Sequence, residues 1–194
     1  MKCTAFALLA LCLAAPTVRA GDGGDGHVGV EAQAPGVCTF TTATRQLAAS
    51  NMTVGSAIQA GGQLFISQLT DQVTGRLQPA SIQIEILGTC NAPHYVSLST
   101  SYGGLKPVEQ QAPVSGTFTQ HVNYRAEVYW AGRTIELTTD GTAGQKATTN
   151  LIAGPNQGPL TLQFVIDGTG NDMLSPTVAG VYSDLLTVQI GQPL

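Results

Sequence analysis

Charged side chains are scarce in this sequence, and the basic ones are never clustered. Asp, Glu, Lys and Arg together make up 10% of its 194 residues, with twelve acidic against eight basic side chains. No run or patch of Lys and Arg occurs along the chain. Proteins that bind nucleic acid or an anionic membrane surface rely on clustered positive charge. The composition therefore makes both of these partners poor candidates.

Long apolar runs are also missing, except near the N-terminus. Ala5–Ala15 is apolar and follows a lysine, but it is too short to span a bilayer. Residues 18–20 (Val-Arg-Ala) fit a small-residue cleavage site, so residues 1–20 are expected to be a secretory signal peptide. The mature chain would then begin at Gly21 with six basic and twelve acidic side chains, a net charge of −6. No later segment is long and apolar enough to span a membrane, so no transmembrane segment is expected after signal removal.

Cysteines are few, and two of the four lie inside the expected signal peptide. The remaining pair is Cys38 and Cys90, and an even pair in an exported protein predicts one disulfide bond. Such a bond would close a loop of roughly 50 residues and contribute about 4 kcal/mol by restricting the unfolded chain. Neither cysteine has a second Cys or His at ligand spacing, so a metal site is less favoured and no cofactor is expected.

Motifs for catalysis are lacking as well. No Gly-x-Ser-x-Gly nucleophile elbow occurs, and the three histidines, His27, His94 and His121, are isolated in sequence. The segment Asp167–Asp172 carries two carboxylates and an Asn, but it does not match the spacing of a calcium-binding EF-hand and is interpreted as a hairpin turn. The chain is therefore expected not to be an enzyme, and a secreted hydrolase is the weakest of the functions considered.

What the sequence does contain is an alternation of apolar and polar residues over most of its length. The alternating segments are separated by turn signals such as Asp140-Gly141, and no convincing helical stripe appears. About seven or eight short strands with such turns predict an all-β fold, an immunoglobulin-like β-sandwich formed by residues 38–194. The expected strands are 38–42, 63–69, 82–86, 95–101, 117–130, 160–166 and 179–190, while 45–60 is expected to be a short helix or an irregular loop.

The clearest expected strand is 117–130. One of its faces carries Val122, Tyr124, Ala126, Val128 and Trp130, and the other carries polar residues and Tyr129. Two aromatic rings on the apolar face are better explained by core packing than by a sugar-binding platform.

The last expected strand, 179–190, is apolar on one face. Leu186, Val188 and Ile190 alternate with Thr187 and Gln189, which places one face against a core. The edges of such a strand must be paired, because an exposed apolar edge promotes aggregation.

A second alternating segment precedes the cysteine-bounded region. Val28, Val30, Ala32 and Ala34 alternate with small or polar residues, and the Gly-rich stretch 21–26 forms a flexible tether before them. Residues 21–37 are thus expected to be a flexible tail that carries a strand. That strand can pair with the chain's own sheet or with another molecule by β-strand addition, and the sequence leaves both possibilities open.

The segment 179–188 resembles the closing motif of the spore coat protein U domain. In that family, which includes subunits of archaic chaperone–usher pili of Gram-negative bacteria, a Gly, one residue and Tyr-x-Asp precede an alternating strand. Gly180, Tyr182 and Asp184 occupy those positions here. The cysteine pair is also similar, whereas the family's arginine-containing segment after the second cysteine is not evident.

The resemblance implies an incomplete sandwich that lacks its final strand and is completed by donor-strand addition. It implies an acceptor groove formed in part by Tyr182, Leu186, Val188 and Ile190, and donor anchors at Val28, Val30, Ala32 and Ala34. A periplasmic chaperone, an outer-membrane usher and neighbouring subunits of the fibre would be the partners. The chain would then be exported through the periplasm to the cell surface as a fimbrial subunit with a role in adhesion or biofilm formation. The alternative is a self-contained secreted β-sandwich that acts as a coat or surface-binding protein.

Overall fold

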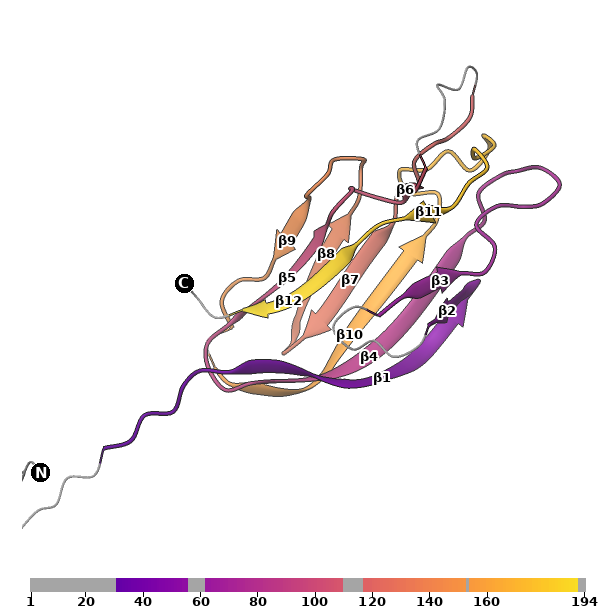
Figure 1. Ribbon diagram of the computed structural model, residues 1–194. Helices are drawn as coiled ribbons and strands as arrows, with labels where there is room; N and C mark the ends of the chain where they lie inside the picture. The colour runs from indigo at the N-terminus through magenta and orange to yellow at the C-terminus, as the bar shows by residue number, and fades with distance from the viewer. Residues whose placement is uncertain (1–30, 56–61, 110–116, 153, 192–194) are drawn as a thin grey trace, which may run out of the picture. The chain divides into compact units, whose positions relative to one another are not determined.

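The computed structural model describes residues 31–55, 62–109, 117–152 and 154–191. The chain divides into two compact units, residues 1–34 and residues 35–194. Within the first unit, the described residues 31–34 form no helix or strand. All regular structure of the second unit, as far as it is described, is β-strand (Figure 1). The prediction of an all-β fold is therefore confirmed.

The strands make four antiparallel sheets. The largest has the order β1-β4-β10-β7-β8, and a second has the order β12-β5-β9. Two further pairs, β2–β3 and β6–β11, are short ribbons. The strands are β1 (Cys38–Ser50), β2 (Met52–Val54), β3 (Leu64–Ile66), β4 (Ala80–Cys90), β5 (Tyr95–Thr100), β6 (Lys106–Pro107), β7 (Arg125–Trp130), β8 (Arg133–Thr138), β9 (Lys146–Thr148), β10 (Asn156–Ile166), β11 (Tyr182–Ser183) and β12 (Leu186–Gly191).

The two larger sheets share one hydrophobic core. Strand β5 of the three-stranded sheet contacts β7 and β8 of the five-stranded sheet, and Figure 1 shows the three-stranded sheet over that region. Buried side chains from both sheets belong to a single cluster, as expected when each sheet buries its apolar face. The cluster includes Ile82 and Ile84 of β4, Val96 and Leu98 of β5, Ala126, Val128 and Trp130 of β7, and Leu160, Leu162 and Phe164 of β10.

The predicted core face of residues 117–130 is confirmed, although the strand itself is shorter than expected. Tyr124 and Trp130 are buried, whereas Tyr129 is 53% exposed. Strand β7 begins only at Arg125, because the preceding residues have other hydrogen-bond partners. The backbone of Val122 pairs with Leu105, and the N–H of Asn123 donates to the side chain of a residue in the β10–β11 loop.

Two other expectations about secondary structure were wrong. Of the segment 45–60, residues 45–50 continue β1 and Met52–Val54 is β2, with Asn51 between them, whereas 56–60 lie outside the described residues. The strand expected over 179–190 is interrupted at Asp184 and Leu185, which separate β11 from β12. The sequence patterns also gave no indication of β6, β8 and β9.

The predicted disulfide bond between Cys38 and Cys90 is confirmed. The two residues lie opposite each other in the register of β1 and β4, so the bond closes the end of that strand pair. The neighbouring Asn91 holds the chain that leads into β1. Its side chain accepts a hydrogen bond from the N–H of Val37 at 2.6 Å and donates one to the carbonyl of Pro35 at 3.1 Å. The compact unit is thereby tied down from Pro35 onward.

Candidate functional site

Strand β12 is an edge strand of the three-stranded sheet. It pairs along its whole length with β5, and within the described residues no strand pairs with its other side. That side of the backbone therefore presents N–H and C=O groups that have no ladder partner in the described chain. An edge of this kind is a template for pairing with a further strand.

The core-facing side chains of β12 are incompletely covered. Val188 and Ile190 lie opposite Leu98 and Val96 of β5, which have no exposed surface, yet both β12 residues remain partly exposed. Leu186 is also partly exposed opposite the buried Thr100. All three β12 residues pack against the core cluster. The core is thus closed on the β5 side and open on the β12 side.

Position at an edge does not by itself explain this exposure. Strand β8 is an edge strand of the five-stranded sheet, and its core-facing Ile135 and Leu137 are only 7% and 5% exposed. Strand β12 also contacts β1. Along β1, Phe40 and Leu47 are 36% and 41% exposed. Apolar surface is therefore left uncovered on both strands.

The predicted acceptor residue Tyr182 lies apart from the other three, in β11. Its ring is partly buried, and its hydroxyl donates a hydrogen bond to the carbonyl of Val178 at 2.8 Å. Burial raises the pKa of this hydroxyl. Of the predicted donor residues, Ala32 and Ala34 are exposed and belong to no strand. Val28 and Val30 lie outside the described residues.

Asp184 occupies the break between β11 and β12, and its carboxylate accepts three backbone N–H groups. Oδ1 accepts those of Tyr102 at 2.9 Å and Leu185 at 2.7 Å. Oδ2 accepts that of Gly104 at 3.1 Å. Sequence analysis identified Asp184 as part of a motif but gave no indication of these partners, because two of them lie about eighty positions earlier in the chain.

Two hydroxyl groups complete the hydrogen bonds of this carboxylate. Thr100 donates to Oδ2, and so does Tyr124, at 2.8 Å. Burial opposes ionisation of Asp184, but the hydrogen bonds from Thr100, Tyr102, Tyr124 and Leu185 outweigh it and lower its pKa below the ordinary value. Burial raises the pKa of Tyr124, and the nearby carboxylate adds to that shift. The pair is therefore an ionised carboxylate and a neutral phenol near neutral pH.

The disulfide end of the molecule brings three potential ligand atoms together. The sulfurs of Cys38 and Cys90 and one nitrogen of His94 lie within 4.8 Å of one another. The statement that neither cysteine has a histidine at ligand spacing was therefore wrong, since His94 follows Cys90 by four residues. The sulfurs are nevertheless joined in the disulfide, and both His94 nitrogens are hydrogen-bonded, to the Ala92 carbonyl and the Trp130 indole.

Residues 167–172 form turns in the β10–β11 loop, but the expected hairpin turn is not present, because β10 and β11 lie in different sheets. The carboxylate of Asp167 accepts the N–H of Thr169 at 2.7 Å, and that of Asp172 accepts the N–H of Leu174 at 2.9 Å. The side chain of Asn171 donates to the carbonyls of Asn123 and Asp167. These polar groups are hydrogen-bonded within the loop and to the backbone of Asn123, which precedes β7.

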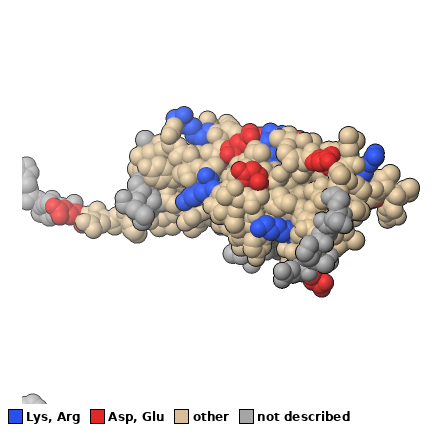
Figure 2. Space-filling view, turned by 90° about the horizontal axis from the view of Figure 1, so that it is seen from above, with Lys and Arg blue, Asp and Glu red and all other residues tan. Residues whose placement is uncertain are grey.

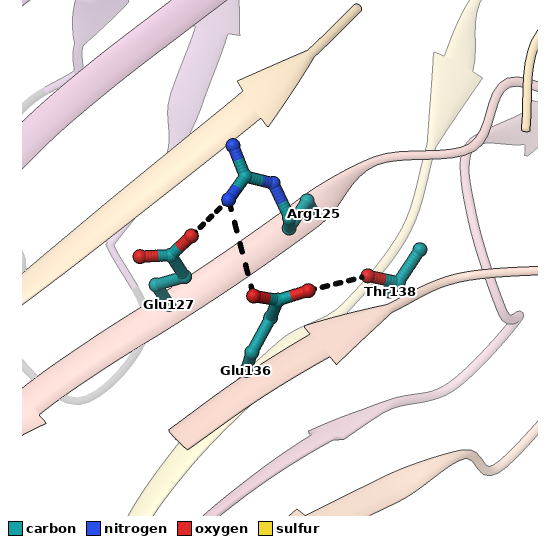
Figure 3. A network of polar contacts seen from close by, with 4 residues as sticks. All are labelled: Arg125, Glu127, Glu136 and Thr138. Atoms are coloured by element: carbon teal, nitrogen blue, oxygen red, sulfur yellow. Dashed lines mark hydrogen bonds and ion pairs between the residues drawn. The ribbon is translucent and has the colours of Figure 1, made fainter. Parts of the chain in front are cut away.

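Ionised side chains on the outward face of β7 and β8 form a small network (Figure 3). Arg125 contacts Glu127 on its own strand, and its Nη1 lies 3.9 Å from the carboxylate of Glu136 on β8. Thr138 donates to Glu136 at 3.0 Å. On the face seen in Figure 2, charged residues are scattered over a mostly neutral surface.

A separate cavity of about 300 Å³ lies beside the β6–β11 ribbon. Its described lining contains no carboxylate, histidine or cysteine. The lining residues are Tyr102, Lys106, Pro107, Val108 and Ser183.

Comparison with protein-family models returns no match, and comparison with curated proteins returns no relative. The resemblance to the spore coat protein U domain therefore stays a prediction. None of the residues that the structure describes forms a helix with the length and hydrophobicity of a membrane span.

Proposed function

We propose that this chain is a structural subunit of a chaperone–usher type fimbria, related to the spore coat protein U domain, and that it polymerises by donor-strand complementation. The observation that carries the proposal is the partial exposure of core-facing Val188 and Ile190 on an edge strand, one side of which pairs with no strand among the described residues. We interpret the fold as an incomplete immunoglobulin-like sandwich whose missing strand would lie beside β12.

A strand inserted there would gain both polar and apolar interactions. Each new main-chain hydrogen bond to β12 contributes about 0.5–1.5 kcal/mol. Full burial of an exposed valine or isoleucine side chain contributes about 1.5–3 kcal/mol, and completing a partial burial contributes less. Alternate side chains of the inserted strand would cover Leu186, Val188 and Ile190, which share one face of β12.

The proposed donor is the segment around Val28, Val30, Ala32 and Ala34 of a neighbouring molecule. Its attachment point is well defined, because the side chain of Asn91 fixes the chain at Pro35 and Val37, beside the disulfide. Insertion of one subunit's tail into the next is a heterologous contact that does not close on itself, so it propagates as a fibre. In this proposal a periplasmic chaperone caps β12 before assembly at an outer-membrane usher, and the fibre is displayed on the cell surface.

The test compares self-association of the mature chain, residues 21–194, with that of a chain beginning at Pro35. We expect the mature chain to form fibres, and the shorter chain to stay monomeric but to bind a synthetic peptide of residues 27–35. Fibre formation by the shorter chain at the rate of the mature chain would contradict the donor assignment. Size-exclusion chromatography and electron microscopy make the comparison.

A pair of matched variants sharpens the test. Val30→Asn changes the proposed anchor face of the tail, whereas Glu31→Asn changes the opposite face at the next residue. We expect Val30→Asn alone to suppress self-association. If the mature chain instead remains a soluble monomer that melts cooperatively, the proposal fails and a self-contained secreted sandwich is the better interpretation.

A further inference from the structure

Strand β5 leads into β6, and β11 leads into β12. The two chain segments pair as β5–β12 and again as β6–β11, but the pairing is interrupted between these two ladders. The gap consists of residues 101–105 and residues 184–185, which belong to none of the twelve described strands. Across this gap the N–H of Ser101 donates to the carbonyl of Leu185 at 3.0 Å. The N–H groups of Tyr102 and Gly104 donate to a side chain of the opposite chain segment. The Asp184 carboxylate accepts both of them.

The same carboxylate links this gap to the five-stranded sheet. The hydroxyl of Tyr124, directly before β7, donates to Oδ2 of Asp184 at 2.8 Å. Tyr124 is 2% exposed, and its ring packs on Phe164 of β10 with the centroids 4.5 Å apart. The phenol is therefore immobilised in the core. Since Thr100 at the end of β5 also donates to Oδ2, Asp184 is fixed from both sheets at once.

We infer that Asp184 is the positioning residue of β12: its hydrogen bonds to Thr100, Tyr124 and the 102–104 loop hold the start of the strand in register before any further strand pairs with it. The expected effect of this ordering on strand insertion rests on the proposed function. An edge strand with one free side loses conformational entropy when a partner binds. A strand that is already ordered lowers that cost and so favours association. Asp184 thus acts on strand insertion through β12 and does not contact the inserted strand.

The matched comparison is Asp184→Asn against Asp172→Asn in the mature chain. Asp172 accepts three hydrogen bonds, from the N–H groups of Leu174 and Ser175 and from the Ser175 hydroxyl, all within its own turn. Asparagine retains the shape of the side chain but replaces one oxygen by an N–H donor, which cannot accept the bonds now made to it. Amide hydrogen exchange of β12 and the self-association rate are the two readouts.

We expect Asp184→Asn to speed amide exchange in β12 by about tenfold or more, because a hydrogen bond to a charged group is worth at least that factor. Exchange in β4 and β10 should change much less, and Asp172→Asn should leave β12 unchanged. Self-association of Asp184→Asn should slow by a similar factor. Unchanged exchange in β12, or an equal increase in every strand, would overturn the inference.

The two hypotheses fail in different ways. If the wild-type mature chain does not self-associate, the proposed function fails, while the exchange of β12 still decides the role of Asp184. Should Asp184→Asn not fold, Thr100→Val replaces it, since this variant removes one donor and leaves the carboxylate in place. A smaller increase of exchange confined to β12 supports the inference, and no increase overturns it.

Discussion

Trp130 donates a hydrogen bond from its indole Nε1 to Nε2 of His94 over 2.9 Å, and both side chains are buried. The other ring nitrogen of His94 lies 2.8 Å from the carbonyl of Ala92. Because Nε2 accepts the hydrogen bond from the indole, Nδ1 carries the imidazole proton and donates a hydrogen bond to that carbonyl. Residues from β7 and from the chain before β5 are thereby joined beside the disulfide.

The first prediction concerns the donor in this pair. Trp130→Phe removes the indole N–H and leaves Nε2 of a buried histidine without a partner, besides creating a small void. We expect a loss of about 3 kcal/mol in the free energy of unfolding. Urea unfolding followed by far-ultraviolet circular dichroism measures it, since the variant has lost the only tryptophan of the chain.

Tyr129→Phe provides the matched control for that variant. Tyr129 is adjacent in β7 but points outward and is 53% exposed. Its substitution should change stability by about 0.5 kcal/mol or less. Equal unfolding midpoints for the Trp130 and Tyr129 variants would show that the buried hydrogen bond contributes nothing.

The second prediction is that Gly88 in β4 cannot be replaced without strain. A Cβ atom at this position would lie 2.8 Å from Cη2 of Trp130 and 3.3 Å from Cδ1 of Phe40. Gly88→Ala should therefore destabilise the protein by about 1–3 kcal/mol through overpacking. A Cβ on Gly154 would meet no atom within 4 Å, so Gly154→Ala should be close to neutral when thermal unfolding of the two variants is compared with that of the wild type.

The third prediction concerns Arg125 and two facing carboxylates. Glu127 and Glu136 lie directly opposite each other in the register of β7 and β8, which is unfavourable for like charges. Arg125 contacts both. Arg125→Gln should therefore cost about 0.5–1 kcal/mol in low salt. The loss should diminish in 1 M salt, where the Debye length is about 3 Å.

Removing one of the carboxylates provides the internal check on this interpretation. The double variant Arg125→Gln/Glu136→Gln no longer has like charges opposite each other, so it should recover most of the lost stability. Melting temperatures at low ionic strength compare the three proteins. A double variant no more stable than Arg125→Gln would mean that the loss comes from another source, such as packing of the arginine stem.

Alternation predicted the strand faces well where one side of a strand meets the core. In β7 and β10, even-numbered residues from Ala126 and Leu160 onward are buried and their neighbours are not. This alternation can be seen in the sequence of each strand by itself. Strand β9 has no such signal, because Ala147 is its only apolar residue. Strand β8 has only two apolar residues, Ile135 and Leu137, which is a short pattern for predicting a strand.

The candidate site could be predicted only in part. The apolar face of β12 is visible in the alternation of Leu186, Val188 and Ile190. Their incomplete burial depends on whether a neighbouring strand exists, which no local pattern records. The break at Asp184 likewise depends on N–H groups at Tyr102 and Gly104 that are distant in sequence. Long-range hydrogen bonds to Asp184 thus interrupt the strand that the apolar–polar alternation of residues 179–190 predicts.

The last prediction is a pH dependence that originates at Asp184. Its hydrogen bonds lower its pKa in the folded state below the ordinary value of 3.8. The unfolded chain therefore binds a proton at a higher pH than the folded protein does. The resulting stabilisation is present above about pH 4–5 and is lost as the pH falls through the folded-state pKa.

Asp184→Asn should be less stable than the wild type by about 2 kcal/mol at pH 7, because it loses hydrogen bonds to a charged acceptor. This difference should shrink as the pH falls from about 4 through the folded-state pKa, because the unfolded chain binds a proton first and the folded carboxyl, once protonated, can no longer accept all five donors. Urea titrations between pH 2.5 and 7 measure both curves. Asp172 has a lowered pKa too, from hydrogen bonds within its own turn, but it is exposed and holds no second strand. The Asp172→Asn curve should therefore stay nearer to the wild type at pH 7, and a constant offset of Asp184→Asn at every pH would contradict the assigned ionised state.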